Sequence, residues 1–149
     1  MILVDTNILL RYANVQDPAF ATVKAAIHSL DAAGEVLCVV PQNYYEFWAA
    51  ATRPTSANGL GLSVPDCRVQ VDRIKRVFLL RPDSGRLFDE WDALVEAHAC
   101  RGRVSYDARL VAAMRTHGVN RLLTFNGSDF ARFPGVTVVD PAAFVTGAP

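Results

Sequence analysis

The sequence predicts an α/β protein with three layers, α/β/α, around a central and mainly parallel sheet. Short apolar runs with the character of buried strands recur along the chain, and longer segments with helical periodicity separate them. Parallel strands require such crossovers, so the helices are expected to cover both faces of the sheet. The 149 residues are enough for a sizeable core, and we expect a single domain over 1–149.

Composition narrows the class of protein. The hydrophobic fraction is 51% and the charged fraction 20%, as in globular chains, and no apolar run reaches the ~18 residues of a membrane span. No signal peptide is recognisable, and Cys38, Cys67 and Cys100 lack a paired zinc spacing. We therefore expect a cytoplasmic protein without a membrane partner, whose cysteines are buried free thiols. The net charge of zero neither indicates nor excludes a nucleic-acid partner.

The first seven residues change abruptly from apolar to polar. Ile2-Leu3-Val4 is predicted to be a strand buried on both faces, and Asp5 follows at its carboxyl end. Thr6 and Asn7 are good N-caps for the helix that begins near Ile8. Ligands of open α/β sheets bind where strands end, so Asp5 is either a site residue or merely a helix cap, and this stretch alone favours neither.

The next segments predict a helix from Asp17 to a stop at Gly34, a buried strand over 35–40, and a helix from Pro41 to Thr52. Glu46 lies in the first turns of that last helix, so it starts near the same edge of the sheet as Asp5. One face of the helix is marked by Tyr45, Trp48, Ala49 and Thr52. The residues that follow, 53–63, are expected to form a mobile loop at the edge of the site.

A capping box at Ser63-Val64-Pro65-Asp66 predicts another helix. Its buried stripe is Cys67, Val71, Ile74 and Phe78. Basic side chains occupy the opposite face and form the best candidate RNA patch, although a solvated helix face is the commoner explanation: Arg68, Arg73, Lys75 and Arg76. A short strand over 77–80 and an amphipathic helix over 87–98 are predicted next.

Two more acids follow in the last third of the chain. Ser105 is predicted to be the N-cap of a helix that runs to His117, which places Asp107 in the first turn, where the helix dipole stabilises it. A buried strand over 122–126 ends in the turn that contains Asp129, and a last strand is predicted over 136–139. Four acids are therefore expected where the strands end: Asp5, Glu46, Asp107 and Asp129.

This set of acids has no partner His or Cys. A cluster made only of carboxylates repels itself unless a cation neutralises it, and hard oxygen ligands select Mg²⁺ or Mn²⁺ over zinc. Such a metal binds phosphate oxygens, and one of its waters can act as a nucleophile. The pattern favours metal-assisted hydrolysis of a phosphodiester.

Three segments resemble PIN-domain ribonucleases, and specifically the VapC-type toxins of bacterial type II toxin–antitoxin pairs. The segments are Ile2-Leu3-Val4-Asp5-Thr6-Asn7, Glu46 in the helix after Pro41, and Asp107-Ala108-Arg109-Leu110-Val111-Ala112 followed by Leu123-Thr124-Phe125-Asn126-Gly127-Ser128-Asp129-Phe130. The resemblance spans nearly the whole chain and implies a single PIN-like fold.

The resemblance implies that Asp5, Glu46, Asp107 and Asp129 hold Mg²⁺ or Mn²⁺ and act in catalysis. It places Thr6 and Asn126 behind these ligands or beside the substrate. It further implies endonucleolytic cleavage of RNA, a homodimer, and a cognate VapB-type antitoxin whose peptide covers the acidic site.

Other functions fit parts of the pattern. Asp5 at a strand end could be the nucleophile of a phosphatase, but haloacid-dehalogenase-like enzymes have a second Asp two residues later, where this chain has Asn7. A PIN nuclease outside toxin–antitoxin pairs, or a non-catalytic PIN-like module that binds RNA or protein, is the remaining alternative. All four acids are present, so nothing in the sequence supports loss of the site.

Overall fold

The computed structural model describes residues 1–145 and contains one five-stranded sheet in the order β3-β2-β1-β4-β5. Each neighbouring pair of strands is parallel, which confirms the predicted α/β class. The strands are short: β1 (Ile2–Val4), β2 (Leu37–Val39), β3 (Leu79–Leu80), β4 (Arg121–Leu123) and β5 (Thr137–Val139).

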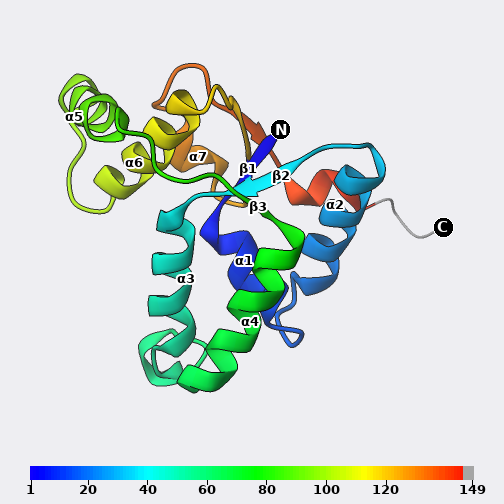
Figure 1. Ribbon diagram of the computed structural model, residues 1–149. Helices are drawn as coiled ribbons and strands as arrows, with labels where there is room; N and C mark the ends of the chain where they lie inside the picture. Colours follow the sequence, from blue (N-terminus) through cyan, green and yellow to red (C-terminus); the bar gives the residue numbers. More distant parts are fainter. Residues whose placement is uncertain (146–149) are drawn as a thin grey trace.

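Every crossover between the strands contains at least one helix, and the final one contains only a single helical turn (Figure 1). The helices are α1 (Thr6–Ala13), α2 (Phe20–Ala32), α3 (Pro41–Thr52), α4 (Val64–Val77), α5 (Leu87–Ala97), α6 (Val104–Thr116) and the single turn α7 (Gly127–Phe130), with 3₁₀ turns at Thr55–Ala57 and Pro141–Phe144. Within residues 1–145, each helix is too short or too polar to cross a bilayer.

The central strand divides the core into two halves because successive side chains of a strand point to opposite faces. Ile2 and Val4 belong to the hydrophobic cluster with α1, α2, α3 and α4, whereas Leu3 belongs to the cluster with α5, α6 and α7. All three side chains are at most 2% exposed. Burial on both faces is the physical reason for the uninterrupted apolar run that predicts this strand.

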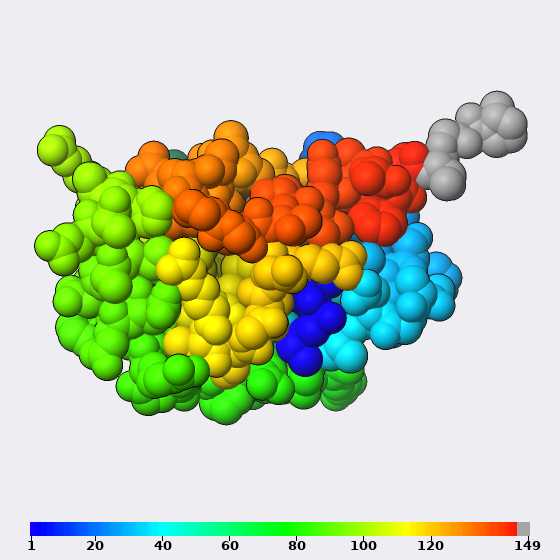
Figure 2. All heavy atoms as spheres, turned by 90° about the horizontal axis from the view of Figure 1, so that it is seen from above, coloured from blue at the N-terminus to red at the C-terminus, as the bar shows by residue number. Residues whose placement is uncertain are grey.

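The amino-terminal ends of the strands meet at one edge of the molecule. Figure 2 shows the first residues, in dark blue, between the cyan segment that contains β2 and the yellow segment that leads into β4. The amino group of Met1 lies 3.4 Å from Glu35, which also pairs with Arg121. The strands are parallel, so their carboxyl ends and the residues that follow gather at the opposite edge.

The predicted helix over 63–78 is confirmed in detail. The Ser63 hydroxyl accepts a hydrogen bond from the backbone N–H of Asp66 (3.2 Å). Each residue of the predicted stripe, from Cys67 to Phe78, is at most 5% exposed. Cys38 and Cys67 are buried as expected, but Cys100 is partly exposed, and all three cysteines are free thiols.

Two predicted helix caps are wrong. Helix α1 begins at Thr6 with Asp5 at the N-cap position, so neither Thr6 nor Asn7 is its N-cap. Helix α6 begins at Val104 with Arg103 at the N-cap, two residues before the predicted cap, because the Arg101–Gly102 turn leads directly into it, and the Ser105 hydroxyl instead donates to the Gly102 carbonyl (2.7 Å). Asp107 remains in the first turn. In α3 the buried residues include Phe47 and Ala51, because α1 and the sheet cover that side of the helix, whereas Tyr45, on the face that the sequence marks, is 66% exposed.

Candidate active site

The structure places all six predicted site residues around one cavity of ≈ 1050 Å³ at the carboxyl edge of the sheet. Asp5 follows β1, Glu46 lies on α3, Asp107 lies on α6 and Asp129 lies on α7. Thr6 and Asn126 line the same cavity. These side chains come from positions as far apart as 5 and 129, and the strand order β2-β1-β4 brings them together.

Asp5 is held by side chains rather than used as a helix cap. It occupies the N-cap position of α1, where its carbonyl accepts from the Ile8 N–H but its side chain forms no capping hydrogen bond. Its Oδ2 accepts hydrogen bonds from Asn7 Nδ2 (2.7 Å) and Thr124 Oγ1 (2.7 Å), and Asn7 Nδ2 also donates to Thr124 Oγ1 (2.9 Å). Burial raises the pKa of Asp5, and the nearby charge of Glu46 raises it further, against the hydrogen bond from Thr124.

Both oxygens of Glu46 are held as well. Thr6 Oγ1 donates to Oε2 (2.7 Å), and Gln42 Nε2 donates to Oε1 (2.7 Å). Asn43, which is fully buried, donates from Nδ2 to Thr6 Oγ1 (3.2 Å) and to the Val4 carbonyl (3.1 Å). The start of α3 is thereby attached to the end of β1, and the direction of the Glu46 carboxylate is set by the fold.

Gln42 is oriented in turn by residues of α6. Its Nε2 also donates to the Tyr106 carbonyl (2.9 Å), and its Oε1 accepts from Arg109 (3.0 Å). Arg109 forms an ion pair with Asp83 at 2.8 Å. Sequence reasoning missed Gln42 and Arg109. The one available signal is that Gln42 precedes Glu46 by four residues, which places both on one face of a helix.

The pKa of Asp107, like that of Asp5, is raised by its surroundings. Burial raises the pKa of Asp107 to about 6, and repulsion from the other carboxylates adds to this effect, in the order Asp129, Asp5 and Glu46. The guanidinium of Arg103 acts in the opposite direction. The four acids are therefore close enough to interact electrostatically, and their joint ionisation costs free energy unless a cation is bound.

The residues fit a hard divalent cation, although they do not form a complete ligand set in this structure. Among residues 1–145, no three His, Cys, Asp or Glu side chains come close enough together to enclose a metal ion. Mg²⁺ does not need such an enclosure, since it keeps several waters and binds through one or two carboxylates together with phosphate oxygens. An all-oxygen donor set with a protonatable Asp107 suits that mode of binding.

Three arginines line the same cavity, and sequence reasoning missed them: Arg53, Arg103 and Arg132. In the described part of the chain none of them forms an ion pair with a carboxylate. Arg103 could have been found from the sequence, because it lies four residues before Asp107 and shares its side of α6. The acidic centre thus has positive charge near it that is free to contact an anion.

The loop after α3 also contributes to the cavity through Asn58. It folds back on the helix, with the N–H groups of Leu60 and Leu62 donating to the carbonyls of Ala50 and Ala51. A Cβ on Gly59 would lie 2.1 Å from the Arg53 carbonyl oxygen, so this close approach requires glycine. In this structure the loop is attached to the end of α3 rather than free of it.

The predicted basic patch on α4 is divided between two sides of the helix. Arg68 and Lys75 line a hollow shared with α3. The Arg73 guanidinium instead lies 5.8 Å from the centre of the Tyr12 ring, on the α1 side. Arg73 therefore does not share one surface with Arg68 and Lys75, because at 3.6 residues per turn its side chain points in a different direction around the helix.

Solved structures share the fold. The chain is similar to a chain of VapBC2 from Rickettsia felis bound to a promoter DNA fragment (TM-score 0.70, 14% identity, 94% of this chain and 98% of that one). It is also similar to Mycobacterium tuberculosis VapC20, described as a sarcin-ricin loop cleaving toxin (TM-score 0.67, 20% identity, 89% of this chain and 95% of that one). A third similar structure is a toxin-antitoxin complex from Klebsiella pneumoniae (TM-score 0.62, 22% identity, 95% of this chain and 98% of that one). These identities are low, so the likeness shows the fold alone.

A comparison with curated proteins found no match. The family model of the PIN domain matches residues 2–136, which includes every strand except the last and all four acids of the cavity. The chain therefore belongs to the PIN domain family.

Proposed function

We propose that this protein is a Mg²⁺- or Mn²⁺-dependent endoribonuclease and the toxin of a VapC-type toxin–antitoxin pair. The observation that supports it most is the cavity lined by Asp5, Glu46, Asp107 and Asp129 with arginines beside it. Membership of the PIN family and structural neighbours described as VapBC, VapC20 and a toxin-antitoxin complex support the same proposal.

In this proposal Asp5 and Asp107 are the principal metal ligands, and Glu46 and Asp129 complete the site directly or through water. With a metal bound by these acids, the site would have an activated water for attack at phosphorus and a positive charge to stabilise the negative charge that develops there. Thr6 and Gln42 hold the Glu46 carboxylate, and Asn7 and Thr124 hold Asp5, so these acids need little reorganisation when the ion binds.

Arginine side chains of the cavity are proposed to bind the RNA substrate. Arg53, Arg103 and Arg132 lie where they can contact the phosphates on either side of the scissile bond. Asp107 holds a proton below pH 6 in the metal-free protein, and cation binding must displace that proton. We therefore expect the affinity for Mg²⁺ to rise with pH through this range.

Two partners belong to the same proposal. A VapB-type antitoxin peptide would cover the acidic cavity. A second copy of the chain would cover the edge of the sheet at β3, where Leu79 and Leu80 are 48% and 44% exposed although both are leucines of a strand. An edge strand with exposed apolar side chains and free backbone groups is a natural contact surface.

Cleavage by the purified protein without antitoxin tests the proposal. Structured RNAs are incubated with Mg²⁺, Mn²⁺ or chelator, beside the matched variants Asp5→Asn and Asp92→Asn, of which the second changes an exposed aspartate on α5. We expect metal-dependent cuts that disappear only in Asp5→Asn. A folded protein that cuts no RNA and whose metal affinity is the same in Asp5→Asn would contradict the nuclease and favour the RNA- or protein-binding alternative.

A further inference from the structure

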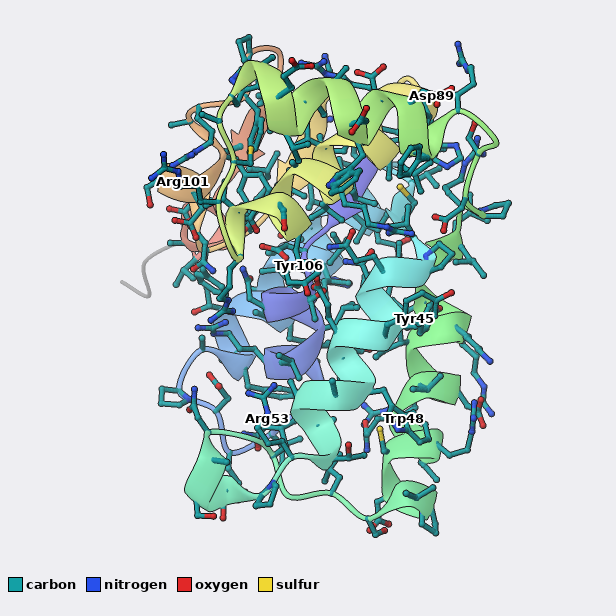
Figure 3. All side chains as sticks on the ribbon, turned by 90° about the vertical axis from the view of Figure 1, so that its left-hand side faces the viewer. Tyr45, Trp48, Arg53, Asp89, Arg101 and Tyr106 are labelled. Atoms are coloured by element: carbon teal, nitrogen blue, oxygen red, sulfur yellow. The ribbon has the colours of Figure 1, made fainter. Side chains whose placement is uncertain are left out.

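The second hollow of the molecule lies between α3 and α4 and is separate from the acidic cavity. It has a volume of ≈ 500 Å³ and is lined by Tyr44, Tyr45, Trp48, Arg68, Val71 and Lys75. We name these residues the α3–α4 hollow. Figure 3 shows Tyr45 and Trp48 extending from α3 toward α4, whereas Tyr106, which lines the acidic cavity, lies on the other side of α3.

The hollow combines aromatic faces with positive charge. Tyr45 is 66% exposed, an unusual position for a large aromatic side chain without a packing partner. The Arg68 guanidinium lies 5.2 Å from the centre of the Trp48 ring. Neither Arg68 nor Lys75 forms an ion pair with a carboxylate in the described part of the chain, and the lining contains no acid.

This chemistry selects a ligand with a flat ring and a negative charge. Aromatic side chains bind unstacked bases by their faces, and Arg and Lys bind the attached phosphates. The hydroxyl of Tyr44, at the wall of the hollow, is buried and has no hydrogen-bond partner among the described residues. An apolar peptide would use the rings but would leave both cations without a counter-ion.

The position of the hollow relates it to the acidic cavity. Tyr45 is the neighbour of Glu46 in α3, so the helix presents one residue to each side. We propose that the α3–α4 hollow is a nucleotide subsite, which binds one unstacked base and its phosphate in a single-stranded region of an RNA whose neighbouring nucleotides reach the acidic cavity. This inference rests on the proposed nuclease function for the identity of the polymer but not for the binding of a nucleotide.

The test uses Trp48 as its own reporter. Trp91→Phe leaves Trp48 as the sole tryptophan of the full chain. Nucleoside 5′-monophosphates are titrated in chelator, beside the corresponding nucleosides and inorganic phosphate. We expect saturable quenching by the monophosphates that weakens with salt, weaker binding of the nucleosides, and no quenching by phosphate alone.

Variants locate the ligand. Tyr45→Ala and Lys75→Gln are each expected to weaken binding about tenfold, whereas Lys24→Gln, at the only other lysine, is not. Asp5→Asn is expected to leave the titration unchanged because it alters only the acidic cavity. Absence of saturable quenching, or quenching that neither hollow variant weakens, would overturn the subsite, as would tight binding of an apolar peptide with none of a nucleotide.

Kinetic measurement of RNA cleavage distinguishes failure of the proposed subsite from failure of the proposed nuclease function. In Tyr45→Ala we expect KM to rise about tenfold with kcat unchanged, because the hollow binds substrate away from the reacting atoms. Cleavage with an unaltered KM would overturn the subsite and leave the nuclease standing. Nucleotide binding in the hollow without any RNA cleavage would overturn the nuclease and leave the subsite standing.

Discussion

Asp107→Asn removes one charge from the acidic cavity with little change in size, and its effect on stability follows from the surroundings of Asp107. In the metal-free protein, burial and the neighbouring Asp129, Asp5 and Glu46 raise the pKa of Asp107 from its ordinary 3.8 to about 6. The folded protein therefore binds this proton more tightly than the unfolded chain does. The contribution of protonated Asp107 to the free energy of unfolding of the wild type is fully present below pH 4 and is lost as the pH rises to about 6.

The magnitude follows from the same pKa values. A change from 3.8 to about 6 corresponds to about 3 kcal/mol for a fully buried group. Asp107 is only half-buried, so solvent screening reduces the expected effect to about 1–1.5 kcal/mol. Above pH 6 without metal, Asp107→Asn should be more stable than the wild type by this amount, or about 3–5 °C in Tm. Below pH 4 the difference should vanish.

Urea unfolding in chelator at pH 4, 5, 6 and 7.5 measures this difference, with Asp92→Asn as the control for loss of an exposed charge. Mg²⁺ should then stabilise the wild type more than Asp107→Asn, because the variant lacks a ligand. A variant that is less stable than the wild type at pH 7.5 without metal, or that differs equally at pH 4, would refute the placement of Asp107 among mutually repelling acids.

Three further predictions concern other parts of the molecule. Gln42→Ala and Arg109→Ala should each lower kcat for RNA cleavage about tenfold, because each releases the Glu46 carboxylate from its fixed orientation. Arg115→Ala, which breaks an ion pair with Glu90, is the control, and a kcat equal to that of the control would show that the orientation of Glu46 is unimportant. Arg103→Gln with Arg132→Gln should reduce the slope of log affinity for RNA against log salt by about two, and an unchanged slope would remove both from the phosphate contacts. Leu79→Asp should convert a dimer to a monomer in light scattering, while Val15→Asp, at another exposed apolar position, should not; a dimer that survives Leu79→Asp would place the contact elsewhere.

The sequence by itself determined the elements and the order of the acids. Hydrophobic runs such as Ile2-Leu3-Val4 identify strands buried on both faces, and the Ser63 capping box with its stripe identifies α4. Asp5 follows β1 directly and Asp129 lies in the helical turn shortly after β4, so their place at the carboxyl edge could be predicted from parallel pairing alone. These features are local or depend only on fold class, which is why periodicity and turn chemistry suffice for them.

Only the tertiary structure decided which side chains support the acids. Asn7 meets Thr124 because β1 pairs with β4, a choice of neighbour that no local pattern encodes. The same holds for the contact of Gln42 with Arg109 and for the division of the α4 cations between two surfaces. Periodicity shows that one face of a helix is buried, but it does not show which element lies opposite, and that element determines the partner of each polar side chain.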